Sequence, residues 1–338
     1  MRVGAIVVLG GSASIERPSP FAAVAVQGEE TQERLGGTPI AALDILGQSA
    51  VHRTIAYLQD CGLQPITLVV AEGMPVPANL SGYSTVPMPA NETDAIWPVM
   101  GRVFDKYVQA GTETILLIRL GAYVEFDFSD LLQFHRDNMQ PVTRLVDSAG
   151  PLDFWMLDAL HCAAAGSDSL HETLARVKDS IAYYDQATYV NRLSSASDVR
   201  HLVVDAFSSR HAVRPSGREV KPGIWLDDNA NVHSRARVAG PVYVGRDTRV
   251  QATALLARFS SVERSCNIGC GTVVADSSIL ANTHLGSWLD VSHAVIFGSK
   301  VAHLRHNVTV DIQDDRLLRR RVSVFRRFLP NFPGMREN

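Results

Sequence analysis

The second half of the chain carries an aliphatic side chain at every sixth position, and this period restricts the fold more than any other feature. Ten positions follow the rule without a miss: Leu226, Val232, Val238, Val244, Val250, Leu256, Val262, Ile268, Val274 and Leu280. An amphipathic helix repeats at 3.6 residues and a half-buried strand repeats at two, so neither explains a period of six. The spacing instead predicts a stack of short strands, each one hexad long.

A second series of small or β-branched residues runs beside the first, four positions after each of its first nine members. These residues are Ala230, Ala236, Val242, Thr248, Ala254, Ser260, Cys266, Thr272 and Ser278. The two series predict a triangular prism, with aliphatic residues on the axis and small residues near the corners. Three hexads close one coil, and coils stack at the strand spacing of about 4.8 Å.

The six-residue phase slips near the end of the repeat. We place the slip at His284–Gly286, where one five-residue step would let the phase resume through Leu285, Val291 and Phe297. The following run, HNVTVDIQDDRLL, is expected to form a closing strand that caps the open end of the prism.

This stretch resembles the hexapeptide repeats of left-handed β-helix proteins. Two such families are candidates, namely acyltransferases and the C-terminal domains of sugar-1-phosphate nucleotidyltransferases. The run GIWLDDNANVHSRARVAGPVYVGRDTRV resembles the beginning of the helix in mannose-1-phosphate guanylyltransferases, and SILANTHLGSWLDVSHAVIFGSKV resembles its end. The resemblance covers about 90 residues and favours the second family.

The first half of the chain alternates apolar runs with helical patterns. Strands are predicted at 3–9, 66–70 and 114–120, and helices at 49–61 and 94–109. A third helix follows Ser129, which is expected to be its cap. This alternation predicts a doubly wound parallel sheet of Rossmann-like α/β type, in which ligands bind beyond the carboxyl ends of the strands.

The order of these elements resembles the nucleotidyltransferase domain over residues 3–140. GTPIAALDILGQSAVHRTIAYLQDCGLQPITLVV is similar to the family segment that begins with Pro-Lys, and FDFSDLLQFHRDN is similar to its Asp-helix-His segment. The resemblance implies transfer of a nucleotidyl group to a sugar-1-phosphate, with release of pyrophosphate.

The residues that the family uses for this reaction are nevertheless missing. Nucleotidyl transfer needs cations on the phosphates and carboxylates on Mg²⁺. The Gly-Thr-Arg loop is replaced by GGSASIERPSP, Pro39 is followed by Ile40 instead of lysine, and the metal-binding Asn-Gly-Asp aligns with Arg119-Leu120-Gly121. Only about 16 residues separate Asn138 from Phe154, where the family places its sugar site. We therefore predict no catalytic residue and no metal ligand in this chain, and Mg²⁺ only if an active alternative holds.

The Gly10-Gly11-Ser12 turn after the first strand is the remaining candidate binding site. Its backbone N–H groups suffice to cradle a phosphate without any side chain, so we predict that Gly10, Gly11 and Ser12 bind a nucleotide. The alternative is a plain strand-to-loop turn.

Side chains in the repeat leave two further interpretations open. An acyltransferase would use one histidine as general base, and five histidines are available: His233, His284, His293, His303 and His306. The simpler interpretation is surface histidines. Cys266 and Cys270 have no second pair to complete a zinc site, and Cys266 is expected to be a packing residue.

The C-terminal stretch combines arginines with apolar residues. Its arginines are Arg316, Arg319, Arg320, Arg321, Arg326 and Arg327. Such a basic amphipathic segment suits an anionic membrane surface or the polysaccharide machinery, and alternatively docks on its own β-helix or on a partner subunit. The net charge of −3 gives no global attraction to nucleic acid.

These patterns together predict a four-part chain. A degenerate nucleotidyltransferase-like domain occupies residues 1–190, a helical linker 191–219, a left-handed parallel β-helix 220–312 and a basic tail 313–338. We expect a non-catalytic or regulatory protein of the nucleotide-sugar and surface-polysaccharide pathway that forms homo-oligomers through the β-helix. The four scattered cysteines suit a reducing cytoplasm, with the inner membrane face as a peripheral location. The alternatives are an active sugar-1-phosphate nucleotidyltransferase with unorthodox ligands and a hexapeptide-repeat acyltransferase.

Overall fold

The computed structural model describes residues 2–9, 34–35, 38–71, 74, 76, 80–88, 96–164, 170, 174, 177 and 180–320. The chain divides into two compact units, Met1–Arg214 and Pro215–Asn338. This division falls inside the predicted linker of residues 191–219, and the helix of that segment, α6 (Ala196–Phe207), belongs to the first unit. Within the described ranges no helix is long and apolar enough to cross a bilayer.

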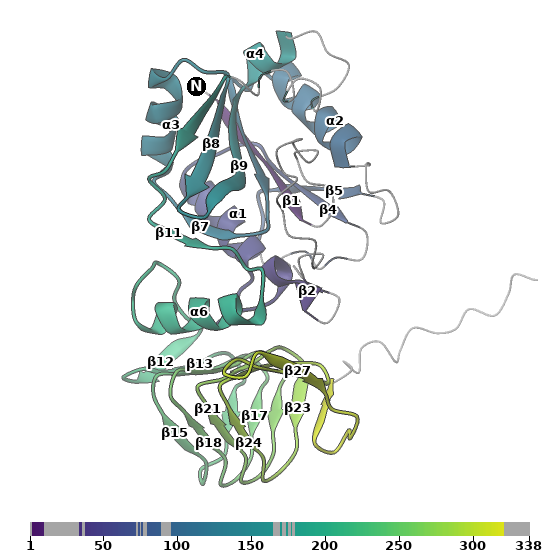
Figure 1. Cartoon of the computed structure of the whole chain (residues 1–338), viewed down its shortest axis with the longest axis vertical. Coiled ribbons are helices and arrows are strands. Elements are labelled where there is room, and N and C mark those ends of the chain that lie inside the picture. Colours follow the sequence, from purple (N-terminus) through teal and green to yellow (C-terminus); the bar gives the residue numbers. More distant parts are fainter. Residues whose placement is uncertain are drawn as a thin grey trace, which may run out of the picture. The chain divides into compact units, whose positions relative to one another are not determined.

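The first unit is built on a seven-stranded mixed sheet (Figure 1). In sheet order its strands are β10 (Ile181–Tyr184), β8 (Val142–Asp147), β9 (Gly150–Asp158), β6 (Thr114–Arg119), β1 (Val3–Leu9), β4 (Ile66–Ala71) and β5 (Ser84–Met88).

The three predicted strands are confirmed as β1, β4 and β6, which pair in parallel through β1. The prediction of a wholly parallel sheet is wrong at β9, which is antiparallel to β6 and β8. The short turn between β8 and β9 allows only a hairpin, because a parallel connection needs a long crossover.

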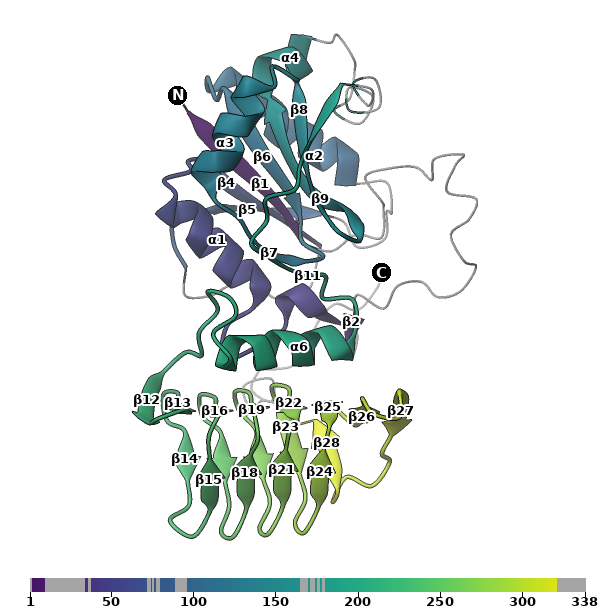
Figure 2. The ribbon, with the colours of Figure 1, turned by 60° about the vertical axis from the view of Figure 1, so that its left-hand side comes forward.

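Helices cover both faces of this sheet. They are α1 (Ala50–Asp60), α2 (Ile96–Gln109), α3 (Phe128–Asp137) and α4 (Ala159–Ala164). Residues of α2 and α4 pack in one core cluster with β-strand residues such as Ile6 and Leu117, and in Figure 2 α1 and α3 lie in front of the sheet with α2 behind it. Smaller elements are β2 (Arg34–Leu35), β3 (Thr38–Pro39), η1 (Ile40–Ala42), β7 (Tyr123–Glu125) and β11 (Tyr189–Asn191).

The termini of two helices test the local predictions. Gly62 follows α1 with φ of +76°, the left-handed conformation that favours glycine after a helix. The helix that the sequence placed after Ser129 begins earlier, at Phe128, and the Asp127 carboxylate caps it by accepting from the N–H groups of Ser129 (2.8 Å) and Asp130 (3.2 Å). The prediction that Ser129 is the cap is therefore wrong, because the Asp127 side chain already binds the first free N–H groups.

Three parallel ladders form most of the second unit (Figure 2). The first contains β13 (Ile224–Leu226), β16 (Val242–Val244), β19 (Ser260–Val262), β22 (Ser278–Ile279) and β25 (Ala294–Phe297). The second contains β14 (Asn231–Val232), β17 (Arg249–Val250), β20 (Asn267–Ile268) and β23 (Thr283–Leu285). The third contains β15 (Arg237–Ala239), β18 (Leu255–Ala257), β21 (Val273–Ala275) and β24 (Asp290–Ser292). The chain visits the ladders in turn, an arrangement consistent with a β-helix.

The register and burial of these strands follow the six-residue period. Val250 lies opposite Val232 in one direction and Ile268 in the other, so one coil takes 18 residues (250 − 232), which is three hexads. Aliphatic residues of successive hexads, such as Val250 and Leu256, are buried in a single core cluster. The small polar residues are also buried and bond between coils. The Thr248 hydroxyl, for example, donates to the Glu263 carbonyl at 2.7 Å.

The slip in the repeat occurs earlier than predicted. Val262 pairs with Ile279 and Ile279 with Ile296, 17 residues on each time, so Ile279 and Ile296 enter the core where the six-residue count placed Leu280 and Phe297. The prediction of a slip at His284–Gly286 is wrong for a local reason. The corner after β18 contains two left-handed residues, Arg258 and Phe259, whereas the equivalent corners after β21 and β24 contain one each, Asp276 and His293.

Four antiparallel strands complete the second unit. They are β12 (Arg218–Lys221), β26 (Lys300–His303), β27 (Val308–Asp311) and β28 (Leu318–Arg320). β12 pairs with β13, β26 and β27 extend the first ladder beyond β25, and β28 extends the second beyond β23. The buried Leu318 lies opposite Leu285, so the first residues of the predicted basic tail pack on the chain's own second unit. Residues 321–338 lie outside the described part.

Candidate functional site

The predicted binding edge of the sheet is where β1, β4 and β6 end together. β1 ends at Leu9 and β6 at Arg119, and Val8 is the register partner of Arg119. Gly10, Gly11 and Ser12 follow Leu9 directly, but they lie outside the residues that the structure describes. Their proposed role in nucleotide binding therefore stays a prediction. The side chains that the structure does describe at this edge carry a different chemistry.

Two arginines share one carboxylate at this edge. A nitrogen of the Arg119 guanidinium lies 3.4 Å from Asp153 Oδ2, and one of Arg144 lies 3.4 Å from Asp153 Oδ1. The two arginine side chains are 13% and 7% exposed and Asp153 is 32% exposed. The group therefore places two guanidiniums against one carboxylate in a largely desolvated place, where an anion is attracted more strongly than in water.

Neighbouring groups fix the position of Arg144. Its Nε–H donates to the Leu152 carbonyl at 2.9 Å, and its guanidinium carbon lies 4.1 Å from the centre of the Trp155 ring. This cation–π contact follows from the register, because Arg144 and Trp155 are direct cross-strand partners of β8 and β9. The Trp155 Nε1–H is buried and has no hydrogen-bond partner among the described residues, which leaves a donor beside the arginines.

A second arginine–aspartate pair holds the β8–β9 hairpin. Arg192 donates from Nε to Asp147 Oδ2 at 3.2 Å and from Nη2 to the Gly150 carbonyl at 2.9 Å. Burial would raise the pKa of Asp147, but the hydrogen bonds from Arg192 and from backbone N–H groups outweigh it and lower the pKa. Asp147 is therefore ionised and paired at neutral pH, and it has a structural role in the hairpin.

Only part of this cluster was predicted from the sequence. Arg119 was named only as the first residue of Arg119-Leu120-Gly121, which aligns with the metal-binding Asn-Gly-Asp and lacks its carboxylate, whereas Arg144, Asp153 and Trp155 were not identified. The sequence signal for this cluster was a charged residue within an otherwise apolar strand. These residues are Arg144 in VTRLVD and Asp153 in LDFWMLD. The antiparallel pairing that joins these residues was not predicted, so their proximity was not foreseen.

The first unit also contains a cavity of about 530 Å³, which lies between α1 and the segment 123–129. Its carboxylates already have partners within the fold: Glu125 accepts from the Tyr123 hydroxyl (2.8 Å) and the Ala212 N–H (2.8 Å), and Asp127 caps α3. Burial raises the pKa of the Cys61 thiol in the cavity wall, so it is not an activated nucleophile. No group of three potential metal-binding side chains occurs in the described ranges. The two carboxylates of this cavity, Glu125 and Asp127, are therefore engaged in contacts that hold the fold.

The second unit pairs one of its candidate histidines with a carboxylate. His293 Nδ1 contacts Asp276 Oδ2 across neighbouring coils, and the two side chains are 23% and 35% exposed. His233 accepts locally from the Arg235 N–H, and His284 bonds the Asn267 amide of the neighbouring coil. Cys266 is fully buried, with its sulfur 3.2 Å from the Leu280 carbonyl, which confirms its prediction as a packing residue.

No family model matches the chain, and none of the curated proteins matches it. Among solved structures, the chain is similar to a putative glucose-1-phosphate thymidylyltransferase from Bacillus anthracis in complex with a sucrose. The TM-score is 0.42 and the identity 11%, over 65% of this chain and 98% of that chain. A likeness at this level assigns neither a family nor an activity.

Proposed function

We propose that the chain is a nucleotidyltransferase-like protein of the nucleotide-sugar and surface-polysaccharide pathway that binds a phosphate-bearing ligand without transferring it. The observation that carries the proposal is the shared contact of Arg119 and Arg144 with Asp153 at the carboxyl edge of the sheet. A guanidinium is a good donor to phosphate and a poor neighbour for Mg²⁺. The presence of two guanidiniums at this edge therefore favours phosphate binding over metal-assisted transfer.

The remaining parts of the proposal concern the loop and the second unit. Gly10, Gly11 and Ser12 would add backbone N–H donors to the same phosphate. The three ladders would form a left-handed β-helix, and their flat faces would join copies of the chain into a homo-oligomer. The segment 313–338 would contact an anionic membrane surface or a polysaccharide-assembly partner at the cytoplasmic face.

The test separates binding from transfer. The purified full chain is titrated with nucleoside triphosphates and nucleoside diphosphate sugars, and pyrophosphate release is followed with mannose-, glucose- and N-acetylglucosamine-1-phosphate in the presence of Mg²⁺. We expect saturable binding to at least one nucleotide and no pyrophosphate. Arg119→Ala should weaken binding roughly ten-fold, as expected for a lost charge-assisted contact. The exposed Arg136→Ala on α3 is the matched control.

Two outcomes would contradict this proposal. Steady pyrophosphate release that is lost on mutation in the Gly10–Ser12 loop would identify an active nucleotidyltransferase, with Mg²⁺ as its cofactor. Equal binding by wild type and Arg119→Ala would remove the arginine cluster from the site.

One observation favours a second candidate, a hexapeptide-repeat acyltransferase. A histidine whose Nδ1 is held by a carboxylate presents its Nε2 as a general base, and His293 has this arrangement with Asp276. Acyl transfer to a sugar hydroxyl that is lost in His293→Ala and reduced in Asp276→Asn would support this candidate over the first.

A further inference from the structure

Among the described residues, the third ladder of the second unit lacks the antiparallel strands that extend the other two beyond the last coil. The first ladder continues beyond β25 into β26 and β27, and the second continues beyond β23 into β28. The third stops at β24 (Asp290–Ser292), and no strand of the described residues pairs with its outer edge. One side of the last coil therefore lacks the antiparallel strand that completes each of the other sides.

The backbone of β24 presents hydrogen-bonding groups at this edge. The Leu289 carbonyl accepts from the Val273 N–H at 2.8 Å and the His293 N–H donates to the Ala275 carbonyl at 3.3 Å, so both face β21. Because these groups alternate along a strand, the N–H and C=O groups of Asp290 and Ser292 face outward. An open edge of this kind is a template for another strand.

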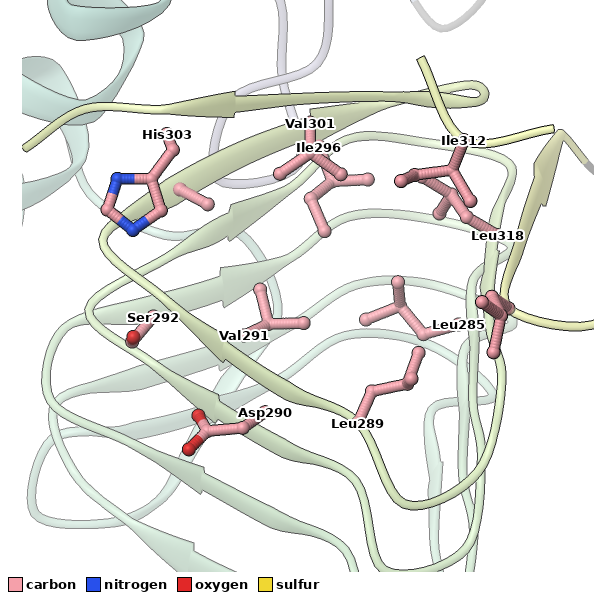
Figure 3. Close-up of a pocket in the computed structure, with 12 residues that line it drawn as sticks. Leu285, Leu289, Asp290, Val291, Ser292, Ile296, Val301, His303, Ile312 and Leu318 are labelled. Atoms are coloured by element: carbon pink, nitrogen blue, oxygen red, sulfur yellow. The ribbon is translucent and has the colours of Figure 1, made fainter. Parts of the chain in front are cut away.

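An apolar cavity of about 280 Å³ lies beside the open edge (Figure 3). It continues the core of the coils, and its aliphatic walls come from different elements: Leu285, Leu289, Val291, Ile296, Val301 and Leu318. Leu289, Val291 and Val301 are only partly buried, although they pack against the core cluster. A side chain that entered from a strand at the edge would complete their burial.

The rim of the cavity is polar and acidic. In Figure 3, Asp290, Ser292 and His303 lie to one side of the cavity and Leu285 and Leu289 to the other. The Asp290 residue is exposed, and His303 Nδ1 is buried without a hydrogen-bond partner among the described residues. A bound strand would place its backbone along this rim, and a basic side chain on that strand would pair with Asp290.

Apolar surface extends past the cavity along β27. Val310 is the register partner of Val301 and Val308 that of His303, so both valines lie on the face of the sheet that lines the cavity. They are 46% and 48% exposed, which is unusual for valines beside an open apolar cavity. A chain segment along β24 would lie next to this surface.

The direction of β28 argues against the chain's own C-terminal segment as the occupant. Leu318 lies beside Leu285, near the corner that leads into β24, whereas Arg320 lies beside Thr283 at the far end of β23. The chain therefore leaves β28 on the side away from β24. Along the stacking direction, β26 and β27 extend beyond the level of β24. The β24 edge therefore favours a single extended segment over a second sheet.

We propose that the outer edge of β24 binds an extended peptide segment of a partner protein. The segment runs antiparallel to β24, as β26 and β28 run to their neighbours. It places an aliphatic side chain in the cavity and a lysine or arginine beside Asp290. This is strand addition, in which backbone hydrogen bonds provide affinity and the cavity provides specificity.

The experiment uses the full chain and a labelled, end-capped peptide, Lys-Thr-Val-Thr-Val-Thr-Lys. We expect saturable binding by fluorescence anisotropy. Amide hydrogen exchange at Asp290 and Ser292 should slow roughly five-fold or more at saturation, because the peptide bonds these groups. The amides of β27, which is also an edge strand, should not change. The same peptide with alternate backbone nitrogens methylated should not bind, since it lacks the N–H donors.

A pair of matched variants tests the cavity. Val301→Trp should fill the cavity and weaken peptide binding roughly ten-fold or more. Val220→Trp, in β12 at the opposite end of the same ladder, places the same side chain at a position that is 40% exposed and should leave binding unchanged. Asp290→Asn should weaken binding of this peptide more than that of a version with glutamine in place of lysine.

Three results would overturn the proposal. The methylated peptide binding as tightly as the parent would show that no strand forms, whatever the folding of the variants. The absence of peptide binding to the full chain would also overturn it. Binding that appears only after residues 321–338 are removed would identify the chain's own C-terminal segment as the occupant.

Discussion

His211 lies in a buried polar network just before the end of the first unit. Its Nε2 lies 3.2 Å from the Leu202 carbonyl, its Nδ1 accepts from the Val213 N–H at 3.0 Å, and its side chain has no exposed surface. Tyr189 stacks on the ring at 4.3 Å. These contacts require the neutral ring with its proton on Nε2, because a protonated Nδ1 could not accept from Val213.

Protonation of His211 should therefore weaken the first unit. Burial lowers the pKa of His211, and Arg214 acts in the same direction, while the Leu202 carbonyl, Glu125 and Asp205 raise it. A pKa below that of the unfolded chain means that the folded state binds fewer protons. The stabilisation is then complete above about pH 6.5 and is lost as the pH falls through the folded-state pKa.

The prediction is tested with His211→Gln. From about pH 7.5 to about pH 5.5 the wild type should lose about 1 kcal/mol more unfolding free energy than this variant, the worth of one hydrogen bond to the Val213 N–H. His161→Gln serves as control because the His161 side chain is 76% exposed. His52 and His135, whose pKa values are also lowered by burial, contribute equally to all three proteins. Parallel pH profiles for wild type and His211→Gln in urea unfolding would refute the prediction.

Within the elements of the second unit, each coil is stabilised by one inward-facing side chain on each of its sides and by hydrogen bonds to the neighbouring coils. Val250 is 2% exposed and lies between Val232 and Ile268, whereas the adjacent Arg249 points outward and is exposed. Thr272 shows how a polar inward residue is tolerated, since its hydroxyl donates to the Gly286 carbonyl at 2.6 Å. A charge at an inward position finds no such partner.

Val250→Asp and Leu256→Asp should each destabilise the protein by several kcal/mol, because they bury a carboxylate on the axis. Arg249→Asp and Arg246→Asp, on the outer surface of the same coil, should cost about 0.5 kcal/mol or less. Thermal unfolding of the four variants measures the difference. If Val250→Asp and Arg249→Asp melt at the same temperature, the inward phase of the repeat is wrong.

The whole molecule consists of two units that bury their hydrophobic cores in different ways. The first buries a twisted sheet between helices, and the second stacks coils that contact mainly their neighbours. Stacked coils have flat, repetitive sides, and such surfaces suit contact between copies of the chain. The proposal of a homo-oligomer is based on this geometry.

Self-association is the prediction at this scale. Light scattering of the full chain at micromolar concentration should give a mass that is a multiple of the 36.8 kDa of one chain. A charge introduced on an outer face should lower this mass if that face forms the contact. Leu255→Glu is such a change, because Leu255 is partly exposed on the third ladder and precedes the inward Leu256. A single-chain mass throughout the concentration range would contradict the prediction.

The sequence by itself determined the repeat unit, the three strands of the first unit and the packing role of Cys266. A period of six favours stacked short strands over a helix or an alternating strand, and an apolar run that ends at glycines favours a buried strand. It also identified Arg119-Leu120-Gly121, at the end of β6, as a segment without the carboxylate that the resemblance implies there.

The tertiary structure decided what depends on pairing between distant segments. The antiparallel β9 brings Asp153 to Arg119 and Arg144, and the shortened corners at Asp276 and His293 shift Ile279 and Ile296 into the core. The open edge of β24 exists only because the two other ladders are extended by strands that fold back on them. Hydrophobic period fixes which side chains are buried within a segment, but strand partners and corner geometry are set by contacts between segments, which no local pattern contains.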